Sequence, residues 1–140
     1  MLYNGLKDDL NTFSKFVYIY ETKIKFIRKV NDFLMVSREA SYLFKHNIQP
    51  KVKYANKYEI ASLADFSKQT LFFTASSVQI IDFCRHLRNS FVHALLEKKD
   101  NKFYITDKSR NKETCKGFLD YTLVKEFVIQ IVKDYELKTK

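Results

Sequence analysis

Residues Ser76 to Glu97, SSVQIIDFCRHLRNSFVHALLE, decide the fold that this sequence predicts. The stretch contains neither glycine nor proline, and its apolar residues recur at helical spacing, so we expect one amphipathic helix. At about 100° per residue, the apolar side chains form one broad arc: Ile80, Phe83, Cys84, Leu87, Phe91, Ala94 and Leu95. The polar side chains fall on the opposite stripe: Gln79, Asp82, His86, Asn89, Ser90, His93 and Glu97. Such a stripe is either a solvated face or a functional one.

The composition favours helices throughout the chain. Two glycines and one proline in 140 residues leave little turn material for a sandwich or a barrel. Hydrophobic residues make up 46% of the chain, which is enough to form one core. We therefore predict a single domain over residues 1–140 with an all-α fold. It would be an up-and-down bundle of four to five helices, with a short β-hairpin or an extended loop between the last two helices.

The N-terminal half predicts several of these helices. Apolar residues recur at three- and four-residue steps from Leu6 to about Lys29, and a second helical pattern runs from Phe33 to Phe44. Whether residues 5–46 form one bent helix or two stays open. A capping pattern at Asn56 predicts a helix that continues through Thr70 into the Ser76–Glu97 stretch.

The last third of the chain predicts a hairpin followed by a helix. The segment Phe103–Thr106 is aromatic and β-branched, and it could pair with Cys115–Leu119 as a short hairpin. Asp120 is placed to cap the final helix.

The charge balance favours a polyanionic partner. Lys and Arg number 25 against 16 Asp and Glu, so the formal net charge is +9. Nucleic acid is the first partner that such an excess suggests, although small domains from lysine-rich proteomes are also often basic. Lys108, Arg110 and Lys112 lie in the loop of the expected hairpin. They are candidate RNA-binding residues, or else a solvated loop.

Cysteine usage and hydropathy argue against several classes of protein. Cys84 and Cys115 are too few for a disulfide framework, and with three scattered histidines they give no four-ligand zinc pattern. We therefore expect no metal and no cofactor. The N-terminus carries acids where a signal peptide needs a basic and then an apolar run. No apolar run approaches the roughly 18 residues of a membrane span. We expect a soluble, cytoplasmic protein that does not contact a membrane.

The string Arg88-Asn89-Ser90-Phe91-Val92-His93, near the end of the expected helix, resembles the Arg-x4-6-His motif of HEPN domains. The resemblance covers roughly Ser76 to Leu119. It implies an all-helical, homodimeric, metal-independent endoribonuclease that acts as a toxin or a phage-defence effector, with RNA as substrate and an antitoxin protein as a candidate partner. The dimer would form through the helix that carries Arg88 and His93.

Each residue of the motif suits one role in RNA cleavage. His93 would be the general acid or base, because both of its protonation states exist near neutral pH. Arg88 would clamp the phosphate with its permanently charged fork, and Asn89 would orient it. His86, one heptad before His93, and Arg85, one turn before Asn89, are supporting candidates.

Two alternatives remain beside the nuclease interpretation. The chain could be a non-catalytic HEPN-like module that binds RNA or protein, or a plain helical interaction protein in which the string is incidental. Arg88 and His93 are five residues apart, about 140° around an ideal helix. Arg88 could therefore be a buried arginine held by a carboxylate such as Asp82, Asp120 or Glu126.

Overall fold

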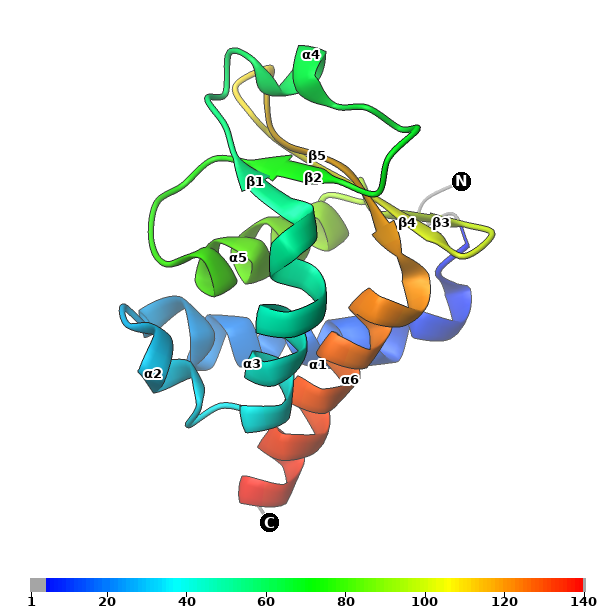
Figure 1. Cartoon of the computed structure of the whole chain (residues 1–140). Helices are drawn as coiled ribbons and strands as arrows, with labels where there is room; N and C mark the ends of the chain where they lie inside the picture. The colour runs from blue at the N-terminus through cyan, green and yellow to red at the C-terminus, as the bar shows by residue number, and fades with distance from the viewer. Residues whose placement is uncertain (1–4, 140) are drawn as a thin grey trace.

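The computed structural model describes residues 5–139 and shows a mixed α/β protein (Figure 1). Within these residues the chain forms six α-helices: α1 (Leu10–Thr22), α2 (Val30–Phe33), α3 (Arg38–Leu43), α4 (Ile60–Leu63), α5 (Gln79–Val92) and α6 (Tyr121–Lys138). It also forms five strands: β1 (Val52–Tyr54), β2 (Leu71–Phe73), β3 (Glu97–Lys99), β4 (Lys102–Ser109) and β5 (Lys112–Asp120). Short 3-10 or π turns extend or join the helices at Lys7–Asp9, Ile24–Phe26, Phe44–Ile48 and Gln49–Lys51.

The prediction of an all-α bundle is wrong. Helices account for 54% of the chain and strands for 19%, and the strands form one sheet in the order β1-β2-β5-β4-β3. The β1 and β2 strands are parallel, whereas the other neighbours are antiparallel. The expected short hairpin is the centre of this sheet, because β5 pairs with β4 on one side and with β2 on the other.

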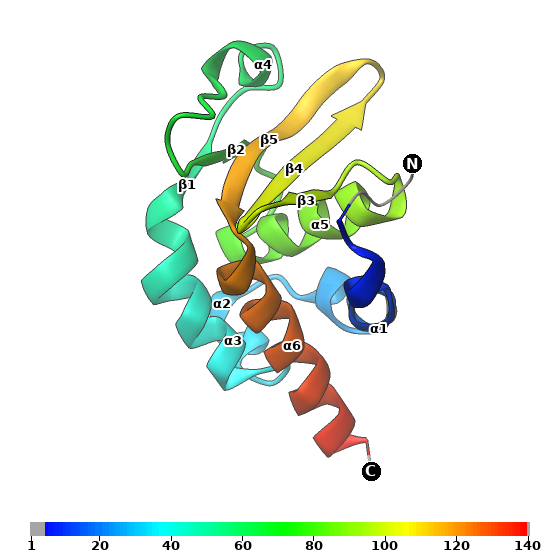
Figure 2. The ribbon, with the colours of Figure 1, turned by 90° about the vertical axis from the view of Figure 1, so that its right-hand side faces the viewer.

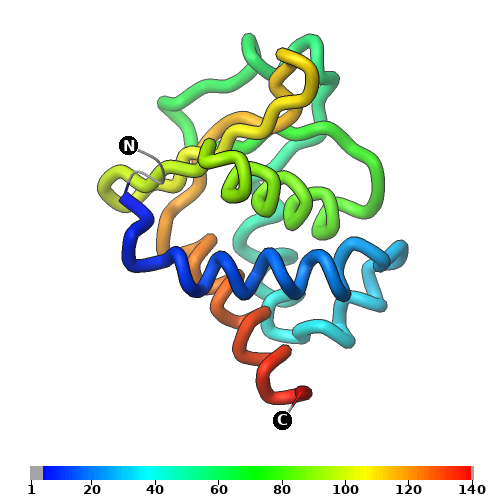
Figure 3. Tube along the Cα trace, turned by 180° about the vertical axis from the view of Figure 1, so that it is seen from behind, coloured from blue at the N-terminus to red at the C-terminus, as the bar shows by residue number. Residues whose placement is uncertain are grey.

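The α5 helix lies between the sheet and the remaining long helices (Figure 2). On one side it packs against α1, and the two helices run beside each other when seen from behind (Figure 3). Phe91 of α5 stacks on Phe13 of α1 with ring centroids 5.3 Å apart, and Phe83 meets Phe127 of α6 at 5.4 Å. On the other side α5 packs against β2 and β4. The helix is therefore enclosed on two faces.

The N-terminal helices are shorter than the periodicity predicts. The α1 helix ends at Thr22, because Lys23 leaves helical geometry with φ −134° and ψ −57°. The open question about residues 5–46 is settled against a single helix, since α1, α2 and α3 are separate. The α3 helix has a conventional cap, in which the Ser37 hydroxyl accepts the Ala40 backbone N–H at 3.0 Å.

The helix predicted from Asn56 into α5 is also wrong. Only the short α4 forms there, and the Asn56 side chain accepts the Tyr58 N–H at 2.8 Å, which makes a local turn instead of a helix cap. Leu71 and Phe73 alternate inward as part of β2, because backbone pairing with β5 is available to them. Tertiary pairing therefore overrides a local pattern that is compatible with either structure.

The β4–β5 hairpin is longer than expected but keeps the predicted pairing, with Phe103 opposite Leu119 and Ile105 opposite Gly117. Its two-residue turn consists of Arg110 and Asn111, both at positive φ, as a type I′ turn requires. The final helix, α6, follows Asp120, but the Asp120 side chain makes no capping hydrogen bond.

The α5 helix itself is shorter at both ends than Ser76–Glu97. It ends in a Schellman motif: the Leu95 N–H donates to Ser90 O at 2.8 Å, and the Ala94 N–H donates to Phe91 O at 3.0 Å. Ala94 adopts φ +58°, a conformation that glycine usually supplies. The chain then turns into β3.

Candidate functional site

The polar stripe of α5 faces the sheet and is largely buried. The side chains of Asp82, His86 and Ser90 are completely inaccessible to solvent. The His86 ring stacks on Phe73 of β2, with ring centroids 5.3 Å apart and planes 17° apart. The stripe is therefore neither a solvated face nor an open cleft along most of its length, and its polar groups must find partners within the protein.

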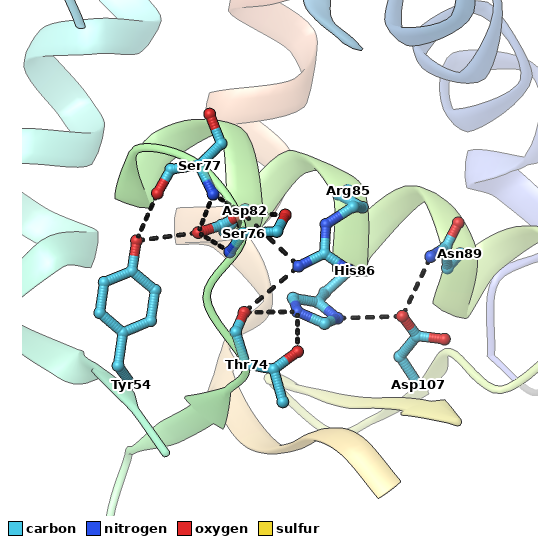
Figure 4. Close-up of polar contacts among 9 residues, drawn as sticks. All are labelled: Tyr54, Thr74, Ser76, Ser77, Asp82, Arg85, His86, Asn89 and Asp107. Carbon is cyan, nitrogen blue, oxygen red and sulfur yellow. Dashed lines mark hydrogen bonds and ion pairs between the residues drawn. The ribbon is translucent and has the colours of Figure 1, made fainter. Parts of the chain in front are cut away.

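His86 is held between two hydrogen-bond acceptors (Figure 4). Its Nδ1 lies 2.9 Å from Asp107 Oδ2, and its Nε2 lies 3.1 Å from the Thr74 carbonyl oxygen. The Asp107 carboxylate only accepts, so Nδ1 carries the proton that it donates to Asp107, and Nε2 faces the Thr74 carbonyl oxygen as a second acceptor. The alternative, in which the Thr74 hydroxyl donates to Nε2, has a longer separation of 3.4 Å. His86 and Asp107 therefore form a buried hydrogen-bonded pair.

Asp107 collects three donors at the point where β4 passes α5. Besides His86, it accepts the Asn89 side-chain amide at 3.1 Å and the Lys108 backbone N–H at 2.8 Å. Burial by itself would raise the pKa of Asp107, but the hydrogen bonds from His86 and Asn89, the charge of His86 and the Lys108 N–H outweigh it and lower that pKa. The carboxylate is therefore ionised at neutral pH.

Arg88 and Asn89, two of the three motif residues, are brought together. The Arg88 Nη1 donates to Asn89 Oδ1 at 2.7 Å, and Nη2 forms an ion pair with Glu21 of α1 at 2.6 Å. The guanidinium also lies 5.9 Å from the centre of the Tyr20 ring. Arg88 is thus held by a carboxylate, as one alternative anticipated, but that carboxylate is Glu21 and none of the three that were named.

His93 stands apart from this network. Its backbone N–H still donates to Asn89 O at 3.0 Å, so it belongs to the last helical turn, and its side chain is exposed. Within residues 5–139, the His93 ring makes no hydrogen bond and no ion pair. A histidine at a helix end that is free to contact another molecule is compatible with a proton-transfer role.

Arg85 is engaged at the other end of α5, where Asp82 anchors the loop before the helix (Figure 4). Asp82 accepts the backbone N–H groups of Ser76 and Ser77 at 3.1–3.2 Å and the Tyr54 hydroxyl at 2.9 Å. The Arg85 Nη2 donates to Thr74 O at 3.2 Å and lies 3.5 Å from Asp82 Oδ1. Burial and the neighbouring Asp82 raise the pKa of Tyr54. The Arg85 guanidinium is therefore bound by Thr74 and Asp82 of the same chain.

The side chains of the three hairpin cations lie outside this network. Lys108, Arg110 and Lys112 are exposed, at or beside the hairpin turn. Among the described residues, no hydrogen bond or ion pair joins them to the three motif residues of α5. The ammonium group of Lys112 instead lies 5.4 Å from the centre of the Tyr58 ring.

Sequence reasoning missed Glu21, Tyr54, Thr74 and Asp107 as partners of the α5 residues. The sequence did contain a signal for Asp107. Phe103, Ile105 and Asp107 are every second residue of one strand, so Asp107 faces inward on the same side as the two apolar residues. No local pattern indicates Glu21, because its meeting with Arg88 depends on how α1 packs against α5.

Residues 5–139 contain no group of three or more His, Cys, Asp or Glu side chains that could hold a metal ion. No helix in this part of the chain is long and apolar enough to cross a membrane. Comparisons with protein-family models, curated proteins and solved structures give no match to this chain.

Proposed function

We propose that the protein is a homodimeric, metal-independent endoribonuclease, with Arg88, Asn89 and His93 of α5 as its reactive residues. The observation that carries the proposal is the fixed position of the Arg88 guanidinium, 2.7 Å from Asn89 and 2.6 Å from Glu21, at the end of the helix that presents His93 to solvent. The resemblance of this string to the HEPN motif supports it. A cytoplasmic toxin or phage-defence effector would fit such an activity.

Arg88 is preorganised to bind a phosphate. Each terminal nitrogen of a guanidinium carries two hydrogens, and Asn89 and Glu21 account for one on each, so two terminal N–H donors remain beside the buried Nε–H, which has no partner among the described residues. Asn89 is itself anchored to Asp107 at 3.1 Å, and Asp107 is anchored to His86. This chain of contacts fixes the guanidinium before substrate arrives, which is the condition for strong electrostatic stabilisation of a transition state.

His93 would transfer the protons. The substrate's own 2′-hydroxyl is the nucleophile: a base removes its proton, the 2′-oxygen bonds to phosphorus, and the P–O5′ bond breaks as an acid protonates the leaving oxygen. The products are a 2′,3′-cyclic phosphate and a 5′-hydroxyl. One imidazole supplies one of the two proton transfers, and a two-fold dimer would bring a second His93 to the same cleft.

A second candidate, a non-catalytic RNA-binding module, is favoured by one specific observation. The close ion pair with Glu21 already neutralises much of the Arg88 charge, which weakens its attraction for a scissile phosphate. Under this alternative the protein would bind RNA, with an affinity that falls steeply in salt, and would not cleave it.

The test is cleavage of end-labelled RNA in excess EDTA by the wild type, His93→Ala and His46→Ala. Both histidines are exposed, so neither change should alter stability by more than about 0.5 kcal/mol. We expect His46→Ala to cleave normally and His93→Ala to lose about 100-fold or more of the rate, as removal of a general acid or base does. The products should carry 2′,3′-cyclic phosphate ends. Undiminished cleavage by His93→Ala would overturn the proposal, and RNA binding without cleavage by the wild type would select the second candidate.

A further inference from the structure

We propose that the outer face of the sheet, which is turned away from α5, binds a single-stranded polynucleotide. The surface is defined by the aromatic residues Tyr58, Phe66, Tyr104 and Phe118 and the lysines Lys57, Lys102 and Lys112, and is called the outer-sheet patch below. This goes beyond the proposed function, because the patch is a second site that needs no chemistry at α5.

The patch exposes aromatic rings that a folded domain usually hides. Tyr58 is 70% exposed and Phe66 is 44% exposed. Phe66 meets Tyr104 with ring centroids 5.8 Å apart, and Tyr104 meets Phe118 across the hairpin at the same separation. Phe66, Tyr104 and Phe118 therefore form a connected row, in which Phe66 is the exposed ring and Phe118 is buried at 5% exposure. Unpaired bases stack on such rings, at about 1–3 kcal/mol per base.

Lysines lie over these rings without a carboxylate partner. The ammonium groups of Lys57 and Lys112 each lie 5.4 Å from the centre of the Tyr58 ring, and that of Lys102 lies 4.9 Å from the Phe118 ring. In the part of the chain that the structure describes, none of the three is within ion-pair distance of an acid. Lys57 and Lys112 can therefore bind a phosphate beside a base stacked at Tyr58, and Lys102 adds a positive charge at the other end of the patch.

The fold holds the patch in place. Tyr104 and Phe118 are directly paired on β4 and β5, and the neighbouring residues Phe103 and Ile105 point to the opposite, α5 side. The segment that carries α4 lies over β5 (Figures 1 and 2). It is tied down by Ile60, which is fully buried, and by the Thr70 carbonyl, which accepts the Phe118 N–H at 3.1 Å.

The chemistry selects a flexible strand over a duplex. In a duplex the base faces are already stacked and cannot reach exposed rings, whereas an unpaired strand can offer bases and phosphates alternately. RNA and single-stranded DNA share this chemistry, so both are candidate occupants. The formal net charge of +9 adds a long-range attraction for either one.

The test measures fluorescence anisotropy of dye-labelled 12-nucleotide strands: 2′-O-methyl oligouridine, which cannot be cleaved through its 2′ position, oligothymidine, and a DNA duplex of equal length. We expect Tyr58→Ala combined with Phe66→Ala to weaken binding of the single strands at least 10-fold. The matched control is Tyr42→Ala on α3, which removes a ring that is 61% exposed elsewhere in the fold. The control should bind like the wild type.

A second measurement separates stacking from charge. Replacing Lys57, Lys102 and Lys112 together by glutamine should reduce the slope of log affinity against log salt by about 2, given roughly 0.7 per phosphate contact on a single strand. Equal binding of both single strands assigns recognition to the shared bases and phosphates, and a preference for the 2′-O-methyl strand adds a contribution from the sugar. Three outcomes would overturn the proposal. These are no binding of the single strands, binding of the duplex as tight as that of the single strands, or an aromatic double variant that binds as tightly as Tyr42→Ala. Because none of these strands is cleaved, the outcome does not depend on the ribonuclease assay.

Discussion

Replacing Asp107 by alanine should be among the most damaging single changes in this protein. The carboxylate accepts hydrogen bonds from His86 Nδ1 at 2.9 Å, from Asn89 at 3.1 Å and from the Lys108 N–H at 2.8 Å. Its removal leaves the Nδ1–H of the fully buried His86 ring and the Asn89 side-chain amide without their acceptor. Leaving buried donors without an acceptor costs about 1–3 kcal/mol for each group, out of a total stability of about 5–15 kcal/mol.

Asparagine at position 107 should cost less than alanine does. Its amide oxygen can take the place of Oδ2 and accept from both His86 and Asn89, so only the Lys108 N–H, which bonds to Oδ1 of the aspartate, loses its acceptor. We expect a loss of about 1–2 kcal/mol, which is the range for a weakened hydrogen-bond network. The assay is urea unfolding followed by circular dichroism, with equal slopes required before the free energies are compared.

The pH dependence provides a second measurement of the same pair. The pKa of Asp107 is lowered in the folded protein, so its stabilising effect is present above the unfolded pKa, near 3.9 for an aspartate, and is lost as the pH falls through the folded value. The stability difference between wild type and Asp107→Asn should therefore shrink below about pH 4. A loss of less than about 1 kcal/mol for alanine, or an unchanged difference down to pH 3, would show that the pair does not stabilise the fold.

Three further predictions concern backbone geometry and the thiols. Ala94→Gly should stabilise the protein by about 0.5–1 kcal/mol in thermal unfolding, because Ala94 ends α5 at φ +58°; a lower melting temperature would contradict this. Gly117→Ala should destabilise it by roughly 2–4 kcal/mol, since the new Cβ would lie 2.1 Å from the Thr70 carbonyl oxygen of the chain beside it, and unchanged unfolding would refute that contact. Burial raises the pKa of both Cys84 and Cys115, so neither should react with a thiol reagent until the protein unfolds, as absorbance of the released chromophore would report.

The sequence predicted those elements whose pattern depends on local spacing. The α6 helix follows from a clear apolar stripe, and the β4–β5 pairing follows from aromatic and β-branched segments around a polar turn. The sheet as a whole could not be predicted, because Leu71–Phe73 is an apolar run that is equally compatible with a helix. Only its pairing with β5, more than 40 residues later, decides the outcome.

Only the local contacts around the candidate site could be predicted from the sequence, because the others depend on segments that are far apart in the chain. Arg88 and Asn89 are neighbours in the chain, so their contact needs only local structure. The burial of His86 depends on Thr74 and Asp107, which two different strands bring to the helix from opposite directions along the chain. A helical wheel shows that His86 and Asp82 share a face, but it cannot show that a sheet covers that face.

The enclosure of α5 between a helical layer and a sheet limits where this protein can acquire or lose activity by mutation. Substitutions along most of the helix disturb aromatic packing on one side or the His86–Asp107 pair on the other, so they affect folding before they affect chemistry. The C-terminal end of the helix, with Arg88, Val92 and His93, combines solvent access with a rigid support. Variation at this end of the helix can therefore change the proposed ribonuclease activity while the rest of the helix stays unchanged.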